Sequence, residues 1–237
     1  MQLFRLVIAS LFVFSLTHAE SGKKLLKPDT VKSTKAKKQK VPAWMKADEF
    51  TISTIEDKAV HLLSTKKGFT FDDSKDKLTL LVVWSTECKS CPQWLSDLNA
   101  LQKQFPKKLS IYALDIGNTE KAALEKLQKA KKDTPKAIKK IINKNHKNLK
   151  AFAKKHQLDF PIISALSNQG NIAFAMQTLY KFEFNKPRGK SKRGGGLPFT
   201  VVFGYEGQTA GFTAGITKKE DFRAYIEKLI QHYDTKK

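Results

Sequence analysis

The sequence predicts an α/β fold of three layers in which helices cover a mixed central sheet. The continuous apolar run at residues 77–84 is typical of a central strand that is buried on both faces. Directly after this run the apolar spacing becomes helical, at Trp94, Leu98, Leu101 and Phe105. Later segments alternate between strand and helix patterns and end in a hairpin and a closing helix, which completes the prediction.

The 237 residues suffice for one domain with attached segments. Residues 1–19 predict a secretory signal peptide, because Arg5 precedes an apolar run at 6–16 and Ala19 offers a small residue for cleavage. A retained anchor is the alternative, although a membrane helix needs roughly 20 apolar residues. Residues 20–46 predict a basic flexible linker, and the folded domain is expected at 47–237.

Within the domain, alternating apolar and polar residues at 49–55 and 58–62 predict an N-terminal β-hairpin. Two lysine-rich helices at 118–148 form a predicted insertion, which is either a docking element for a partner or a solvated excursion. The other expected elements are a strand at 109–114 closed by Asp115, a helix starting at 149–156, a strand at 160–164, a helix at 171–176, a basic loop at 188–196, a hairpin at 199–203 and 209–213, and a helix at 218–233.

The chain is strongly basic, with 44 Lys and Arg against 22 Asp and Glu and a formal charge of +22. Nucleic acid is not the expected partner, because the lysines are scattered without interleaved aromatic residues and the chain carries an export signal. A solvated basic surface is the preferred interpretation. Weak attraction to anionic membrane surfaces or acidic proteins stays open.

The chain has two cysteines, Cys88 and Cys91, which are too close together to stabilise the fold by closing a long loop. They lie where the buried strand gives way to the amphipathic helix. Unpaired backbone N–H groups at a helix start, with Lys89 beside them, would lower the pKa of the Cys88 thiol below its usual value of about 8.5. Cys91, expected one turn inside the helix, would then resolve a mixed disulfide.

Other uses of this motif fit the sequence less well. A zinc site needs about four ligands, and there is no second pair of cysteines or closely spaced histidines to complete it. Covalent haem attachment needs a histidine after the second cysteine, where this chain has Pro92. The five histidines are scattered, so no metal site is predicted.

In these features the chain resembles the thioredoxin superfamily, and within it the exported TlpA/ResA/CcmG-like group of thiol–disulfide oxidoreductases. Trp84 stands four residues before the first cysteine, as in that group. The segment around Leu197 and Pro198 is similar to the cis-proline loop that leads into a strand. The resemblance implies a thioredoxin-like fold in which Cys88 and Cys91 are catalytic. It also implies that Leu197, Pro198 and Trp84 contact the substrate.

The sequence departs from this group at three places. Glu87 stands where relatives have tryptophan, and its negative charge opposes thiolate formation, so Glu87 and Lys89 are candidate modulators. Trp94 occupies the place of an acidic residue three positions after the second cysteine. Asp97 and Asp115 are the remaining candidates for a proton acceptor, each also explicable as a solvated helix residue or a strand-end turn.

Together these observations predict a monomeric periplasmic reductase whose only redox group is the Cys88–Cys91 disulfide, with no added cofactor. By resemblance, its substrates are cysteine-containing exported proteins, including apocytochromes c. By the same resemblance, its electrons are expected to come from a membrane thiol carrier of the DsbD/CcdA kind. The alternatives are a disulfide oxidase or isomerase, or a non-catalytic thioredoxin-fold module that binds an acidic partner.

Overall fold

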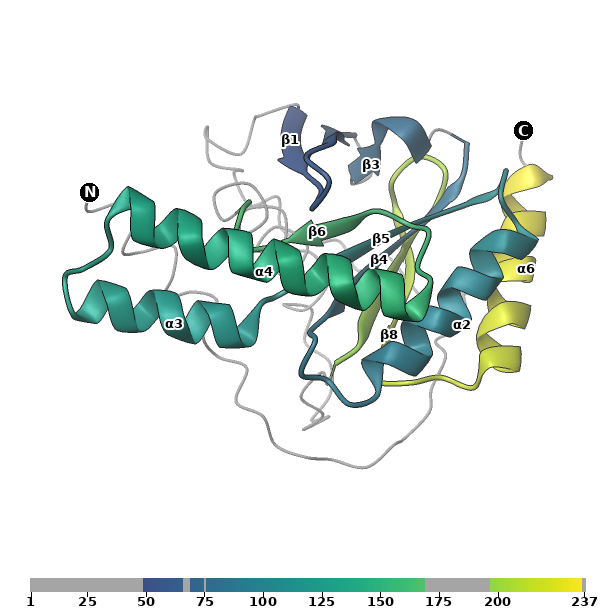
Figure 1. Ribbon diagram of the computed structural model, residues 1–237. Coiled ribbons are helices and arrows are strands. Elements are labelled where there is room, and N and C mark those ends of the chain that lie inside the picture. The colour runs from purple at the N-terminus through teal and green to yellow at the C-terminus, as the bar shows by residue number, and fades with distance from the viewer. Residues whose placement is uncertain (1–48, 66–68, 75, 169–196, 236–237) are drawn as a thin grey trace, which may run out of the picture.

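The computed structural model describes residues 49–235 apart from 66–68, 75 and 169–196 (Figure 1). The predicted signal peptide, linker, helix at 171–176 and basic loop at 188–196 lie outside the described residues. Among the helices that the structure does describe, none is both long and apolar enough to cross a membrane.

A five-stranded mixed sheet forms the centre of the fold, in the order β6-β5-β4-β7-β8. β4 (Leu78–Trp84), β5 (Leu109–Asp115) and β6 (Ile162–Ser164) run parallel. β7 (Phe199–Phe203) lies antiparallel to β4, and β8 (Thr209–Ala214) pairs with β7 as a hairpin. Every residue of β4 and β5 is buried, as the continuous apolar run predicts for central strands. The predicted mixed sheet is confirmed.

Helices cover one face of this sheet. α2 (Cys91–Gln104) and α6 (Lys219–Asp234) place Trp94 and Phe222 edge to face, with ring centroids 5.0 Å apart. α4 (Pro135–His156) adds Leu149 and Phe152 to the core that contains Trp94 and Phe222. Leu80 of β4 belongs to the same core. The amphipathic spacing of these segments therefore directs their apolar faces to one core.

A small antiparallel sheet, rather than helices, covers the opposite face among the described residues. It consists of β1 (Glu49–Ser53), β2 (Ala59–Ser64) and β3 (Phe69–Phe71), and Phe71 stacks on Tyr112 of β5 at 4.1 Å. The N-terminal hairpin is confirmed. β3 and the short 3₁₀ helix η3 (Asp72–Ser74) were not predicted, because three-residue elements show too little periodicity.

The insertion folds as a helical hairpin of α3 (Asn118–Lys129) and α4, which lie side by side in Figure 1. The Thr134 hydroxyl caps α4 by accepting the N–H of Ala137 at 3.3 Å, and Pro135 is the first helical residue. The prediction of a separate helix from residue 149 is wrong. Neither glycine nor proline interrupts α4 there, so the helix continues to His156.

Candidate active site

The two cysteines lie where β4 ends and α2 begins, and they are joined by a disulfide. Cys91 is fully buried, whereas Cys88 is half-buried and reaches the surface. The predicted order of exposure therefore holds, but the predicted depth of Cys91 in the helix does not. α2 begins at Cys91 itself, so Cys88 lies just before the positive end of the helix dipole. Cys88 is the sulfur that an incoming thiol or disulfide can reach.

The loop that carries Cys88 is held by short-range hydrogen bonds. The Cys88 N–H donates to the Ser85 carbonyl at 3.0 Å, and the Cys91 N–H donates to the Cys88 carbonyl at 3.2 Å. The Ser90 hydroxyl lies 3.5 Å from the Cys88 sulfur. Hydrogen bonds to a charged group favour its ionised form, so Ser90 can help to stabilise a Cys88 thiolate. The sequence prediction missed this role, for which a hydroxyl between the two cysteines was the available signal.

The two predicted modulators, Glu87 and Lys89, flank Cys88 and are both exposed to solvent. Solvent and salt screen charges in such positions. Glu87 also donates its backbone N–H to the Ser85 hydroxyl at 3.3 Å, which helps to shape the loop. We therefore expect the charges of Glu87 and Lys89 to have smaller effects on Cys88 than the helix start and Ser90.

The Leu197–Pro198 peptide bond is cis and immediately precedes β7. Because Val83 pairs with Phe199 in the β4–β7 ladder, Pro198 follows on beside Trp84 at the end of β4 that leads into the cysteine loop. Leu197 is half-buried and packs against the same core cluster as Cys88. The structure thus brings Leu197 and Pro198 to the same end of the sheet as the two cysteines.

Trp84 and Trp94 both belong to the core. Trp84 has no exposed surface and packs on Phe152 at a centroid distance of 4.7 Å, so in this structure its side chain contacts the core, and its contact with substrate stays a prediction. Trp94 is also fully buried and donates its indole N–H to the Thr200 hydroxyl at 3.0 Å. This hydrogen bond links α2 to β7. Trp94 lies three residues after Cys91, and Thr200 lies two residues after the cis-proline.

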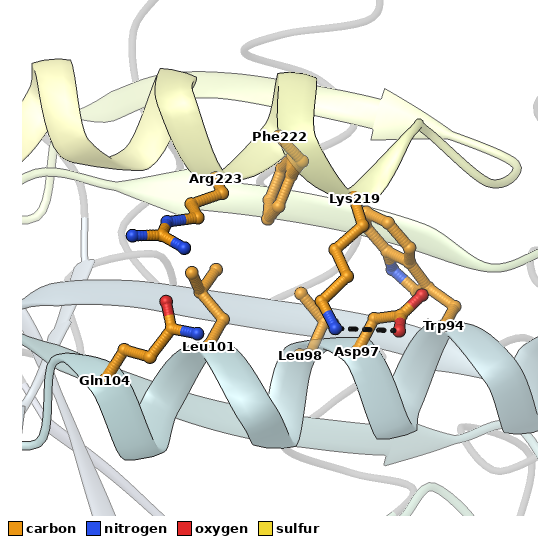
Figure 2. A pocket seen from close by; sticks show the side chains of 8 residues that line it. All are labelled: Trp94, Asp97, Leu98, Leu101, Gln104, Lys219, Phe222 and Arg223. Atoms are coloured by element: carbon orange, nitrogen blue, oxygen red, sulfur yellow. Dashed lines mark ion pairs between the residues drawn. The ribbon is translucent and has the colours of Figure 1, made fainter.

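Asp97 is half-buried on the side of α2 that faces α6. Its carboxylate accepts from Gln93 at 3.1 Å and forms an ion pair with Lys219 of α6 at 3.7 Å. Figure 2 shows this pair beside Trp94 and Phe222, at a hollow between α2 and α6 with room for about one water molecule. The hollow is too small for a substrate, and Asp97 acts as a clamp between two helices.

Asp115, the last residue of β5, is fully buried and pairs in register with Trp84. One carboxylate oxygen accepts from the Asn145 amide at 3.2 Å, and the Asn145 oxygen accepts from the Ser164 hydroxyl at 2.6 Å. The other oxygen, Oδ1, is buried without a hydrogen-bond partner among the described residues, as is the indole N–H of Trp84. A buried acid therefore stands at the end of the strand next to the one that carries the cysteines.

The pKa of Asp115 is raised to about 6, chiefly because burial disfavours the charged carboxylate, with a smaller contribution from the nearby Glu120. Asn145 and the backbone N–H groups of Gly117 and Thr86 act in the opposite direction. Thr86 belongs to the loop before Cys88, so the Asp115 carboxyl lies near the start of that loop. Of the two candidate acids, Asp115 is the one that adjoins the site. Elsewhere, no three His, Cys, Asp or Glu side chains of the described residues gather as metal ligands.

The comparisons with known proteins agree with this geometry. Residues 45–210, more than half of the chain, match the AhpC/TSA family. The chain belongs to the AhpC/TSA family. This membership, with the sheet order and the position of the cysteines, confirms the predicted resemblance to thioredoxin-like proteins.

This AhpC/TSA protein is also similar to individual proteins and solved structures. Thioredoxin-like protein YneN of Bacillus subtilis is 29% identical over 107 residues, which are 45% of this chain and 49% of YneN. The chain thus spans about half the length of this curated relative. A thiol:disulfide interchange protein from Chlorobium tepidum is 17% identical, with a TM-score of 0.47 over 78% of this chain and 94% of that one. StoA from Bacillus subtilis is 15% identical, with a TM-score of 0.43 over 75% and 95%.

Proposed function

We propose that this AhpC/TSA protein is a thiol–disulfide oxidoreductase that reduces disulfides in exported proteins. The observation that carries the proposal is the half-exposed Cys88 joined to a buried Cys91 at the start of α2. In this arrangement the Cys88 sulfur is accessible to a substrate, and the buried Cys91 sulfur is placed to resolve the mixed disulfide.

In the reducing direction, the reaction begins with both cysteines as thiols. The Cys88 thiolate attacks a substrate disulfide, a Cys88–substrate disulfide forms, and the other substrate sulfur leaves as a thiolate that takes up a proton. Cys91 then loses its proton and attacks the Cys88 sulfur. The Cys88–Cys91 disulfide forms and the second substrate thiol is released. The substrate gains two electrons and two protons, which the protein loses.

The cellular setting is part of the proposal. The predicted signal peptide supports a periplasmic location, where cysteine-containing exported proteins, apocytochromes c among them, would be the substrates. A membrane thiol carrier of the DsbD/CcdA kind would return the electrons to a monomeric protein. The reducing direction is supported by the Lys89–Ser90 dipeptide, which lacks the histidine that stabilises the thiolate in strong oxidases.

Insulin reduction by dithiothreitol tests the proposal. The wild-type chain is expected to accelerate the precipitation of reduced insulin, and Cys88→Ser should return the rate to that of dithiothreitol alone, because the attacking thiolate is gone. Ser96→Ala is a matched control, since Ser96 is exposed on α2. Full activity in Cys88→Ser would refute the assignment. If the wild-type chain does not accelerate insulin reduction and the Cys88→Ser protein still binds an acidic partner, the non-catalytic binding module is favoured instead.

A further inference from the structure

Helix α4 carries a face made of lysines. All eight of its lysines are exposed, and its 22 residues include neither Asp nor Glu. At 100° per residue these side chains fall within an arc of about 160° on one side of the helix. We call this set the lysine face: Lys136, Lys139, Lys140, Lys144, Lys147, Lys150, Lys154 and Lys155.

The lysine face points away from the protein core. Asn145, Leu149 and Phe152 lie on the opposite side of α4, where Asn145 and Leu149 are buried and Phe152 packs on Trp84. Figure 1 shows α4 crossing the outside of the sheet, with α3 alongside it. The charges of the lysine face are therefore presented to solvent by a rigid, packed helix.

No acidic side chain among the described residues neutralises this face. Within the described residues, ion pairs of other surfaces join Lys103 to Asp159, Lys108 to Asp234 and Arg223 to Glu227, and none involves the eight lysines. Four acids lie outside the described residues, at Glu20, Asp29, Asp48 and Glu183, too dispersed in sequence to form an acidic run. Lysines three and four residues apart on one helix repel each other, so this arrangement favours an external anionic partner.

The composition of the face identifies the kind of anion. The eight cations are lysines without arginine, which suits a diffuse field of negative charge rather than bidentate recognition of single phosphates. No aromatic side chain is exposed on this face to stack on nucleobases. The one large apolar residue exposed among the described residues, Ile216, lies elsewhere, so the face has nothing to insert into hydrocarbon.

We propose that the lysine face of α4 is a peripheral membrane-binding surface that holds the protein against bilayers of anionic phospholipid. The helix is about 33 Å long, so its lysines can lie along a flat bilayer together. Each lysine near an anionic bilayer adds to binding, and salt weakens the total steeply. This inference is independent of the redox chemistry of Cys88 and Cys91.

Vesicle flotation of the purified full chain tests the inference. Vesicles of phosphatidylcholine with about one third phosphatidylglycerol are expected to carry the protein at about 0.05 M salt and to release it at about 0.5 M. Neutral phosphatidylcholine vesicles should not carry it. The decisive variant changes four lysines at the centre of the face, Lys136, Lys140, Lys147 and Lys154, to glutamine, which has a helix propensity close to that of lysine.

The matched control changes four exposed lysines of other elements to glutamine and lowers the net charge equally: Lys58, Lys107, Lys218 and Lys228. The α4 variant is expected to bind at least about tenfold more weakly than wild type, and the control variant less than about threefold more weakly. Unchanged insulin reduction would show that both variants are folded. Equal loss in the two variants, or no binding by wild type, would overturn the proposal. Tighter binding to duplex DNA than to vesicles, lost in the α4 variant, would also overturn it and assign the face to nucleic acid.

Discussion

Replacing Cys91 with serine is expected to stop turnover and to leave substrate proteins covalently attached to Cys88. Cys88 stays half-exposed and can still attack a disulfide, but the sulfur that resolves the mixed disulfide is gone. Turnover in insulin reduction should fall on the order of 10³-fold, the scale of removing one member of a catalytic unit. Non-reducing gels of the Cys91→Ser protein from cells should show adducts that dithiothreitol releases.

The double variant Cys88→Ser, Cys91→Ser is the control, because it lacks both sulfurs and should form no adducts. Cys88→Ser alone should also form few, since the remaining thiol of Cys91 is fully buried. Adducts that form on Cys91 rather than on Cys88 would contradict the assigned order of attack. Mass spectrometry of the trapped proteins would identify the substrates directly.

Asp115→Asn is expected to stabilise the protein at neutral pH by up to about 3 kcal/mol. The carboxylate is buried and its pKa is raised from 3.8 to about 6, so the unfolded chain ionises first as the pH rises. Stability is therefore lost between about pH 4 and pH 6, and the full cost of the buried charge is present above that window. At about 1.4 kcal/mol per pKa unit, the difference in pKa corresponds to about 3 kcal/mol.

Urea unfolding of the oxidised protein at several pH values measures this effect. The gain in unfolding free energy from Asp115→Asn should be small near pH 4, grow through pH 5 and level off near pH 7. Asp133→Asn, on an exposed carboxylate between α3 and α4, is a matched control that should change the free energy of unfolding little. A variant that is less stable than wild type at every pH would show that the hydrogen bonds of the carboxylate outweigh the cost of burying it.

Much of the fold follows from local patterns in the sequence. β4 and α2 can be predicted without knowing which elements pack against them. Burial by any neighbour requires the same local pattern, a continuous apolar run for β4 and helical apolar spacing for α2. Short elements could not be predicted this way. β3 and η3 are held mainly by tertiary contacts, such as the stacking of Phe71 on Tyr112.

The site was predictable to the extent that it is local. The spacing of Cys88 and Cys91 and the proline at position 198 are visible in the sequence, and the structure brings them to one end of the sheet. The environment of Asp115 is not local, because its partner Asn145 comes from α4, and Ser164, which donates to Asn145, comes from β6. An available signal was Asn145, a polar residue on the apolar side of its helix.

The equilibrium reduction potential of the Cys88–Cys91 pair, measured against glutathione or dithiothreitol, tests the proposed reducing function most directly. A protein that feeds electrons to exported disulfides needs a stable disulfide of its own, so we expect a value near about −270 mV. A value near about −120 mV would contradict this account, because a pair with that potential would oxidise its substrates.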